Sequence, residues 1–151
     1  MTTPVPEISF KRILAPVDGS DHGFHAARTA AQLARSLGSS LTILTVYDAP
    51  SASLGEPNYS RALSEALDHA RAVVEEARQA VRDAGGPEPE VEWLGGGPAE
   101  RIISVARDGK YDLVVMGTHG RGRLRAALLG SVSNAVAAGA GRPVLVVGVH
   151  P

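Results

Sequence analysis

The sequence predicts an α/β fold: a single doubly wound, five-stranded parallel sheet with helices on both faces. Short apolar runs alternate with longer amphipathic segments along the chain, which indicates strands that alternate with helices. The apolar runs are nearly continuous, as is typical of strands that are buried on both faces. The length of 151 residues is enough for one compact domain with one core.

The first expected elements are two strands joined by a helix. Arg12–Val17 is an apolar run, and Gly19-Ser20-Asp21 is a turn and N-cap signal for an Ala-rich helix that ends near Leu37. Leu41–Tyr47 is apolar and β-branched, which indicates the second strand. The Pro, Ser and Gly residues of Asp48–Tyr59 predict a surface loop.

The middle of the chain carries the strongest helical pattern. Apolar residues recur there at intervals of four and three, so that they share one helix face: Leu63, Leu67, Ala70, Val74, Ala77 and Val81. Gly85-Gly86-Pro87 ends this helix, and Val91–Leu94 is expected as a short third strand. Ala99–Lys110 follows as the third helix, with Pro98 at a plausible first helical position.

The last quarter of the chain completes the alternation. Leu113–Met116 is expected as a buried strand, Gly117–Gly130 as a Gly- and Arg-rich loop, Ser131–Ala140 as a helix and Pro143–Val149 as the last strand. Right-handed crossovers then favour the strand order 3-2-1-4-5. Ligands of such sheets bind where the order reverses, so the sequence predicts a site where Asp18 and the loop after strand 4 emerge.

The composition narrows the classes of function. Hydrophobic residues make up 44% and charged residues 21%, an ordinary balance for a globular protein. The net charge of −1 gives no general attraction to nucleic acid or to an anionic membrane. The absence of cysteine excludes disulfides, thiolate catalysis and cysteine-based zinc sites. No apolar run approaches the ~20 residues of a membrane span, and Met1–Phe10 contains no apolar signal region, so a cytoplasmic protein is expected.

The loop after the fourth strand contains a pattern that suits phosphate. Glycines at Gly117 and Gly120 allow sharp turns and close approach of the backbone to a ligand. Gly130-Ser131 opens a helix, where unpaired N–H groups and the positive end of the helix dipole favour an anion. The same loop carries positive charge at Arg121, Arg123 and Arg125. These arginines could clamp a phosphate or, equally, form a solvated face.

From about Phe10 to Val149 the chain resembles the universal stress protein family, in its ATP-binding branch. The family signature G-x2-G-x9-G-[ST] is matched by Gly117, Gly120, Gly130 and Ser131. Further matching segments are Ile13–Ser20, Pro98–Ile102, Asp112–Gly117 and Pro143–Val147, whereas Asp48–Tyr59 has no family signature. The resemblance implies an adenine-nucleotide alpha hydrolase-like fold, with a tail over residues 1–9 and an ATP-binding domain over residues 10–151.

The resemblance also implies a nucleotide contact for each matching position. Pro16 and Val17 should line the adenine and ribose region, and Val46 should offer backbone groups to the adenine edge. Asp18 should contact the ribose or a phosphate-bound Mg²⁺. The other positions should surround the ribose (Met116, Gly117) and the phosphates (Gly120, Gly130, Ser131, Val132, Ser133).

Several of these residues have a purely structural alternative. Asp18 could simply begin the turn after its strand, and Ser131 is a good N-cap without any ligand. His119 could contact phosphate or shuttle a proton, but a solvated loop histidine is the more common case. His22 and His25 lie one helical turn apart with no third ligand to complete a metal site, so a polar helix face is expected for them.

The last strand is expected at the sheet edge, and an apolar edge is usually covered. We therefore expect Val144–Val147 to pair with the same strand of a second copy in a homodimer, an arrangement that the family resemblance also implies; the alternative is a monomer.

Three functions remain open. They are an ATP-binding regulatory module in a stress response, a slow ATPase or phosphotransferase that uses Asp18 or His119, and an ATP-independent scaffold. The first is preferred, because the phosphate loop is complete and no general base is evident. The sequence contains neither a P-loop nor a Gly-x-Ser-x-Gly elbow, which argues against P-loop NTPases and α/β-hydrolases.

Overall fold

The computed structural model describes residues 3–4, 7–118 and 129–148. Five parallel strands form one sheet in the order β3-β2-β1-β4-β5, which confirms the expected topology. The strands are β1 (Arg12–Pro16), β2 (Ser40–Tyr47), β3 (Glu90–Gly95), β4 (Leu113–Gly117) and β5 (Val144–Val147). The helices are α1 (Asp21–Leu37), α2 (Asn58–Asp83), α3 (Pro98–Asp108) and α4 (Ser131–Gly139), with one 3-10 turn, η1 (Ala52–Leu54).

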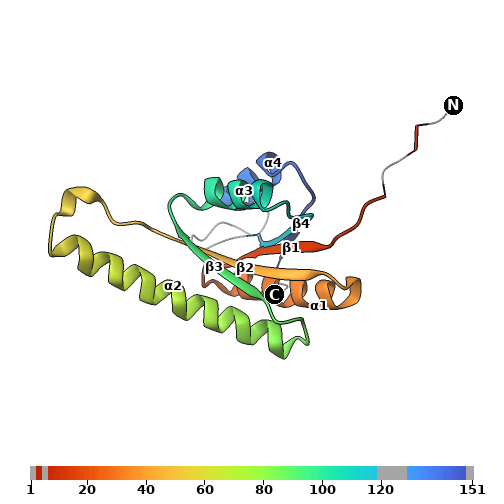
Figure 1. Ribbon diagram of the computed structural model, residues 1–151, viewed down its shortest axis with the longest axis horizontal. Helices are drawn as coiled ribbons and strands as arrows, with labels where there is room; N and C mark the ends of the chain where they lie inside the picture. Colours follow the sequence, from red (N-terminus) through yellow and green to blue (C-terminus); the bar gives the residue numbers. More distant parts are fainter. Residues whose placement is uncertain (1–2, 5–6, 119–128, 149–151) are drawn as a thin grey trace.

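Helices cover both faces of the sheet, α1 and α2 on one side and α3 and α4 on the other (Figure 1). The alternation of side chains along each strand divides the core accordingly. Ile13 and Val115 pack into the cluster under α1 and α2, whereas Leu14 and Val114 pack into the cluster with Ile102 under α3 and α4. The sheet is therefore doubly wound, as the continuous apolar strands predict.

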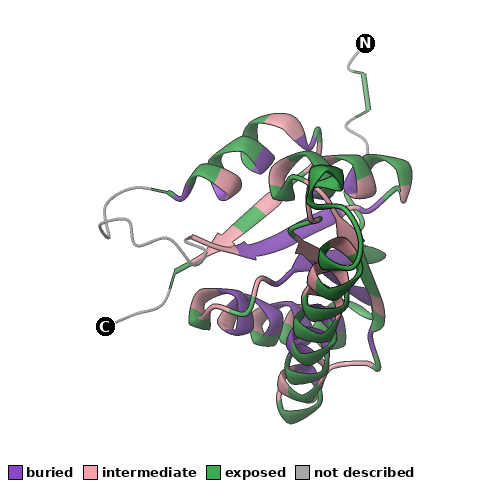
Figure 2. Cartoon of the chain, turned by 90° about the vertical axis from the view of Figure 1, so that its left-hand side faces the viewer, coloured by how far each residue is buried: buried purple, intermediate pink, exposed green. Residues whose placement is uncertain are grey.

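Helix α1 begins and ends where the sequence predicts. Ser20 is its N-cap, and the Ser20 hydroxyl accepts a hydrogen bond from the N–H of Gly23 at 3.1 Å. Gly38 ends it in the left-handed conformation, with φ of 68°, which glycine adopts without strain. The inner face of α1 carries small buried side chains that bring the helix close to the sheet: Ala26, Ala27, Ala30, Ala31 and Ala34. Figure 2 draws buried residues in purple.

Helix α2 is longer than expected. It begins at Asn58, inside the segment expected as a loop, and η1 occupies part of the remainder of that segment. The first turns of α2 extend beyond the sheet (Figure 1) and contain no fully buried residue before Ala70. The amphipathic pattern was the signal for this helix, and it is weak where no core lies underneath.

Smaller boundary errors occur at other strand ends. β1 ends at Pro16 rather than Val17, β4 includes Gly117, and β5 ends at Val147 rather than Val149. The expected position of Pro98 as the first residue of α3 is confirmed. Among the residues that the structure describes, no helix is long and apolar enough to cross a membrane.

Candidate functional site

A cavity of about 290 Å³ opens at the carboxyl ends of β1, β2 and β4, on the side of the sheet covered by α3 and α4. The order of the sheet reverses between β1 and β4, so the cavity lies where the topology predicts a ligand. Its volume is close to the lower end of the range for small-molecule pockets. The walls are formed by Pro16, Val17, Asp18, Gly23, Leu44, Val46, Asp48, Pro98, Ile102, Met116, Gly117, Thr118, Gly130, Ser131, Val132 and Ser133.

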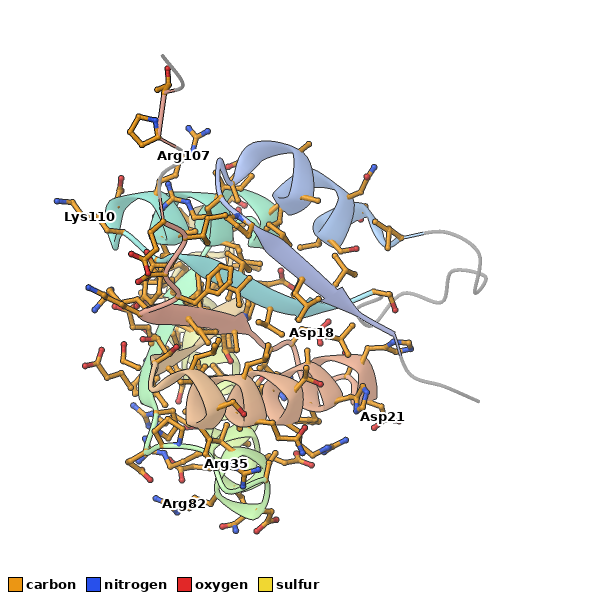
Figure 3. The ribbon with its side chains drawn as sticks, turned by 90° about the vertical axis from the view of Figure 1, so that its right-hand side faces the viewer. Asp18, Asp21, Arg35, Arg82, Arg107 and Lys110 are labelled. Carbon is orange, nitrogen blue, oxygen red and sulfur yellow. The ribbon has the colours of Figure 1, made fainter. Side chains whose placement is uncertain are left out.

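Asp18 lies between the end of β1 and the start of α1, where Figure 3 labels it. Its Oδ1 atom accepts hydrogen bonds from the backbone N–H of Ser20 at 3.0 Å and from the Ser20 hydroxyl at 2.5 Å. The turn-forming role considered for Asp18 is therefore present. The same half-buried side chain also lines the cavity, so the turn holds a carboxylate at the cavity wall.

Thr118 joins the end of β4 to the start of α4. Its carbonyl oxygen accepts hydrogen bonds from the N–H of Gly130 at 2.6 Å and from the Ser133 hydroxyl at 2.9 Å. The Ser133 hydroxyl also lies 3.0 Å from the carbonyl oxygen of Gly130 and is buried. The hydroxyl proton of Ser133 is thus used to hold the backbone of this corner together.

Position 117 needs a glycine because of close packing and not because of a turn. A Cβ atom there would lie 2.8 Å from the carbonyl carbon and the Cβ atom of His22. Such a distance is too short for any side chain, so the absence of a Cβ lets β4 approach the first turn of α1. This close approach brings the end of β4 and the start of α1 together at the cavity.

Three helix N-termini meet at the cavity, and they differ in charge and capping. α1 is capped by the Ser20 side chain and carries Asp21 in its first turn, and α3 carries Glu100 in its first turn. α4 follows Gly130, which offers no side-chain cap, and has no acidic residue in its first turn. Of the three, α4 is the best suited to bind an anion at its unpaired N–H groups.

The other end of the cavity is apolar and lies over β2. Leu44 and Val46 of β2 and Ile102 of α3 line it, and all three pack in or against the same core cluster. Asp48 follows β2 and places an exposed carboxylate at this end. The cavity therefore has an apolar end with one acidic group and an opposite end built from helix N–H groups.

The structure brings most of the predicted site residues to this one cavity. Those that line it are Pro16, Val17, Asp18, Val46, Met116, Gly117, Gly130, Ser131, Val132 and Ser133. His119, Gly120 and Arg121 lie outside the described residues, as do Arg123 and Arg125. The alternative role of Ser131 as an N-cap is wrong, because Gly130 is the N-cap of α4; the expected start of the helix at Ser131 is confirmed.

Sequence reasoning missed six lining residues: Gly23, Leu44, Asp48, Pro98, Ile102 and Thr118. Asp48 could have been found from the alternation of the strand, because it lies two residues beyond Val46 and so falls on the same face. Leu44 and Ile102 looked like ordinary core positions, and only the packed structure shows that the core ends there.

The side chains that the structure describes do not by themselves build a metal site. Among residues 3–4, 7–118 and 129–148, no group of three or more His, Asp or Glu residues is arranged to hold an ion. The acidic side chains that line the cavity are Asp18 and Asp48.

Comparison with known proteins agrees with this architecture. A model of the universal stress protein family matches residues 9–148. A universal stress protein of Thermus aquaticus is 41% identical over 138 residues, which cover 91% of this chain and 98% of the relative. The solved structure of the universal stress protein UspA from Lactobacillus plantarum superposes with a TM-score of 0.82 at 28% identity and covers 93% of this chain and 99% of its own. A universal stress protein solved in complex with cAMP superposes with a TM-score of 0.73 at 27% identity, covering 92% and 97%.

Proposed function

The chain belongs to the universal stress protein family, and we propose that its domain of residues 10–151 is an ATP-binding regulatory module in a stress response. The observation that carries this proposal is the cavity at the switch point of the sheet, with the start of α4, which no described side chain caps, at one end. An apolar pocket that ends in free helix N–H groups suits a flat base joined to a phosphate.

The proposed ligand lies along the carboxyl edge of the sheet. Its adenine occupies the apolar end between Val46 and Ile102, and its ribose hydroxyls face Asp18. The phosphates lie at the first turn of α4, where Ser131 and Val132 contribute backbone N–H groups. The remaining predicted contacts, including Pro16, Met116 and Gly117, surround the ribose in this arrangement.

The residues present fit Mg²⁺ only as a companion of the nucleotide. Mg²⁺ in nucleotide sites is held by one or two carboxylates together with phosphate oxygens and water. Asp18 lines the cavity and would be its protein ligand, and the ion would neutralise phosphate charge. This is consistent with the lack of a three-residue ion site among the described side chains.

The neighbour in complex with cAMP supports an adenine nucleotide as the ligand class. Among the residues that the structure describes, the titratable side chains that line the cavity are two carboxylates, Asp18 and Asp48, and on these a binding role is favoured over catalysis. Asp18 already accepts two hydrogen bonds from Ser20, which reduces its suitability as a general base.

The test is direct binding. Isothermal titration of the purified protein with ATP, ADP, AMP and cAMP in the presence of Mg²⁺ gives their affinities, and GTP serves as the matched base control. Acid extraction followed by chromatography identifies any adenine nucleotide that co-purifies. Saturable binding of ATP in preference to GTP supports the proposal. Protein that carries no nucleotide, and shows no heat of binding and no rise in Tm with any adenine nucleotide, refutes it.

We also propose that the module is a homodimer through β5. β5 lies at the edge of the sheet, and its Leu145 side chain is 40% exposed. The exposed side chains of the neighbouring α4 are small and uncharged, including Ala137 and Ala138, so a second copy can approach closely. Light scattering after gel filtration should give twice the 15.6 kDa mass of the chain. Leu145→Arg should give the single-chain mass, and a single-chain mass for the unaltered protein at all concentrations contradicts the dimer.

A further inference from the structure

His22 links the first helix to the phosphate end of the cavity. It lies in the first turn of α1 and is half-buried, and its Nδ1 atom lies 3.1 Å from the Thr118 hydroxyl. These two residues are 96 positions apart in the sequence, so the contact joins separate parts of the chain. A threonine hydroxyl can donate or accept, so the hydrogen bond can form with either tautomer of the imidazole.

Thr118 is the residue that fixes the start of α4. Its N–H donates to the carbonyl oxygen of Val147 at 3.1 Å, and its own carbonyl oxygen accepts from Gly130 and Ser133. A displacement of Thr118 therefore moves the backbone that leads into the first turn of α4. Thr118 is also one of the residues that line the cavity.

The distance between His22 and this corner is set by contact of the two backbones. Because Gly117 has no side chain, β4 lies directly against the backbone of His22. The imidazole thus meets the Thr118 hydroxyl from a fixed position. A fixed donor and acceptor pair of this kind loses little entropy when its hydrogen bond forms.

The same turn of α1 also holds the Asp18 carboxylate. Asp18 accepts from Ser20, and the Ser20 hydroxyl accepts from the N–H of Gly23, the residue that follows His22. The start of α1 is therefore bonded both to the Asp18 carboxylate at the cavity wall and, through His22, to the corner that carries the α4 N-terminus.

We propose that His22 is a positioning residue for the phosphate end of the site: through Thr118 it holds the first turn of α4 in the orientation that binds phosphate. The inference rests on the adenine-nucleotide binding proposed above. His22 does not line the cavity, so its effect on the ligand is indirect. The chemistry of the contact requires a hydrogen-bonding atom at the position of Nδ1, one bond beyond Cγ.

The test compares affinities for Mg-ATP and for adenosine, which has no phosphate, by isothermal titration. His22→Ala should weaken ATP about three- to tenfold, as expected for one neutral hydrogen bond at about 1.4 kcal/mol per tenfold, with adenosine affinity unchanged. His22→Asn should restore ATP affinity, because its amide places a polar atom where Nδ1 lies. His22→Gln, with the amide one bond farther out, should not restore it.

Two further variants keep the test decisive if His22→Ala folds poorly. Thr118→Val keeps the shape and removes the hydroxyl, so it should reproduce the effect of His22→Ala, and the double variant should add little. His25→Ala is the control on the same helix, because His25 lines a separate groove beside α2 and should leave ATP affinity unchanged.

The outcomes separate the two proposals. If the unaltered protein binds neither ATP nor adenosine, the nucleotide function fails. If it binds both but His22→Ala and Thr118→Val keep ATP affinity within twofold, or weaken ATP and adenosine equally, the positioning role of His22 fails and the nucleotide function stands.

Discussion

Replacement of Ser131 by proline removes one backbone N–H from the proposed phosphate site while leaving the helix intact. Ser131 is the first residue of α4, the position at which proline is most readily accepted in a helix. Gly130 before it has φ of −64° and ψ of 159°, an extended conformation that suits a residue preceding proline. An N–H at this position has no partner within the helix, so its loss should leave the free energy of unfolding nearly unchanged.

The expected effect on the ligand is large. A hydrogen bond from an N–H group to a charged phosphate oxygen contributes about 1.5–3 kcal/mol, which corresponds to roughly 10- to 150-fold in affinity. Ser131→Ala is the matched control, because it removes the hydroxyl and keeps the N–H. The ratio of the dissociation constants of Ser131→Pro and Ser131→Ala for Mg-ATP therefore isolates the backbone donor.

Isothermal titration gives the two dissociation constants, and circular dichroism with thermal melting shows that both variants fold. Ser131→Pro should bind Mg-ATP at least tenfold more weakly than Ser131→Ala, with the same affinity for adenosine. If the two variants are folded and bind Mg-ATP within threefold of each other, the N–H of Ser131 does not hold phosphate and the proposed orientation is wrong.

Three further predictions concern stability. Gly117→Ala places a Cβ atom 2.8 Å from the backbone of α1 and should cost about 1–3 kcal/mol by overpacking, measured as a lower urea midpoint; an unchanged midpoint would contradict the close approach. Thr45→Val removes a buried hydroxyl that donates to the carbonyl oxygen of Val17 at 3.0 Å and should cost about 0.5–1.5 kcal/mol, also measured as a lower urea midpoint. The pKa of Glu88 is lowered, mainly by its hydrogen bond from Arg82, so its contribution to stability is present at neutral pH and is lost as the pH falls through that lowered pKa. The melting temperatures of Glu88→Gln and the unaltered protein should therefore converge in acid, and a constant difference down to the lowest pH would refute this. Because both side chains of the pair are exposed, the difference in melting temperature at neutral pH should be small and should shrink with added salt.

The strand order could be predicted because it depends on general rules that leave clear traces in the sequence. Buried parallel strands are nearly continuous apolar runs, as in Leu113–Met116, and right-handed crossovers restrict the order. The position of the cavity followed from that order, before any motif was considered. The start of α2 at Asn58 could not be predicted in this way, because the helix continues past the sheet, where side chains are exposed and periodicity carries little information.

Details of the site depend on contacts that the sequence does not show. Glycine and serine are both good N-caps, so the pair Gly130-Ser131 does not show which residue caps α4, although the start of the helix at Ser131 is predicted correctly. The hydrogen bond from the Gly130 N–H to Thr118 holds Gly130 in an extended conformation and makes it the cap. For His22 the sequence predicts only a polar helix face, because its partner Thr118 lies 96 residues away in the chain.

The electrostatic asymmetry of the cavity determines which way the proposed ligand can lie. The positive end of the α4 dipole faces one end, and the Asp48 carboxylate lies at the other. A nucleotide bound in reverse would place its phosphates beside Asp48, where like charges repel, and would leave the N–H groups of α4 without a charged acceptor. In the proposed orientation the phosphate charge is met by those N–H groups, and the neutral base is next to Asp48, which can accept a hydrogen bond from an exocyclic amino group. Two local features of the sequence thus favour one direction of binding. They are the start of α4, which has neither a described side-chain cap nor an acidic residue, and the alternation along β2 that places Asp48 on the same face as Val46.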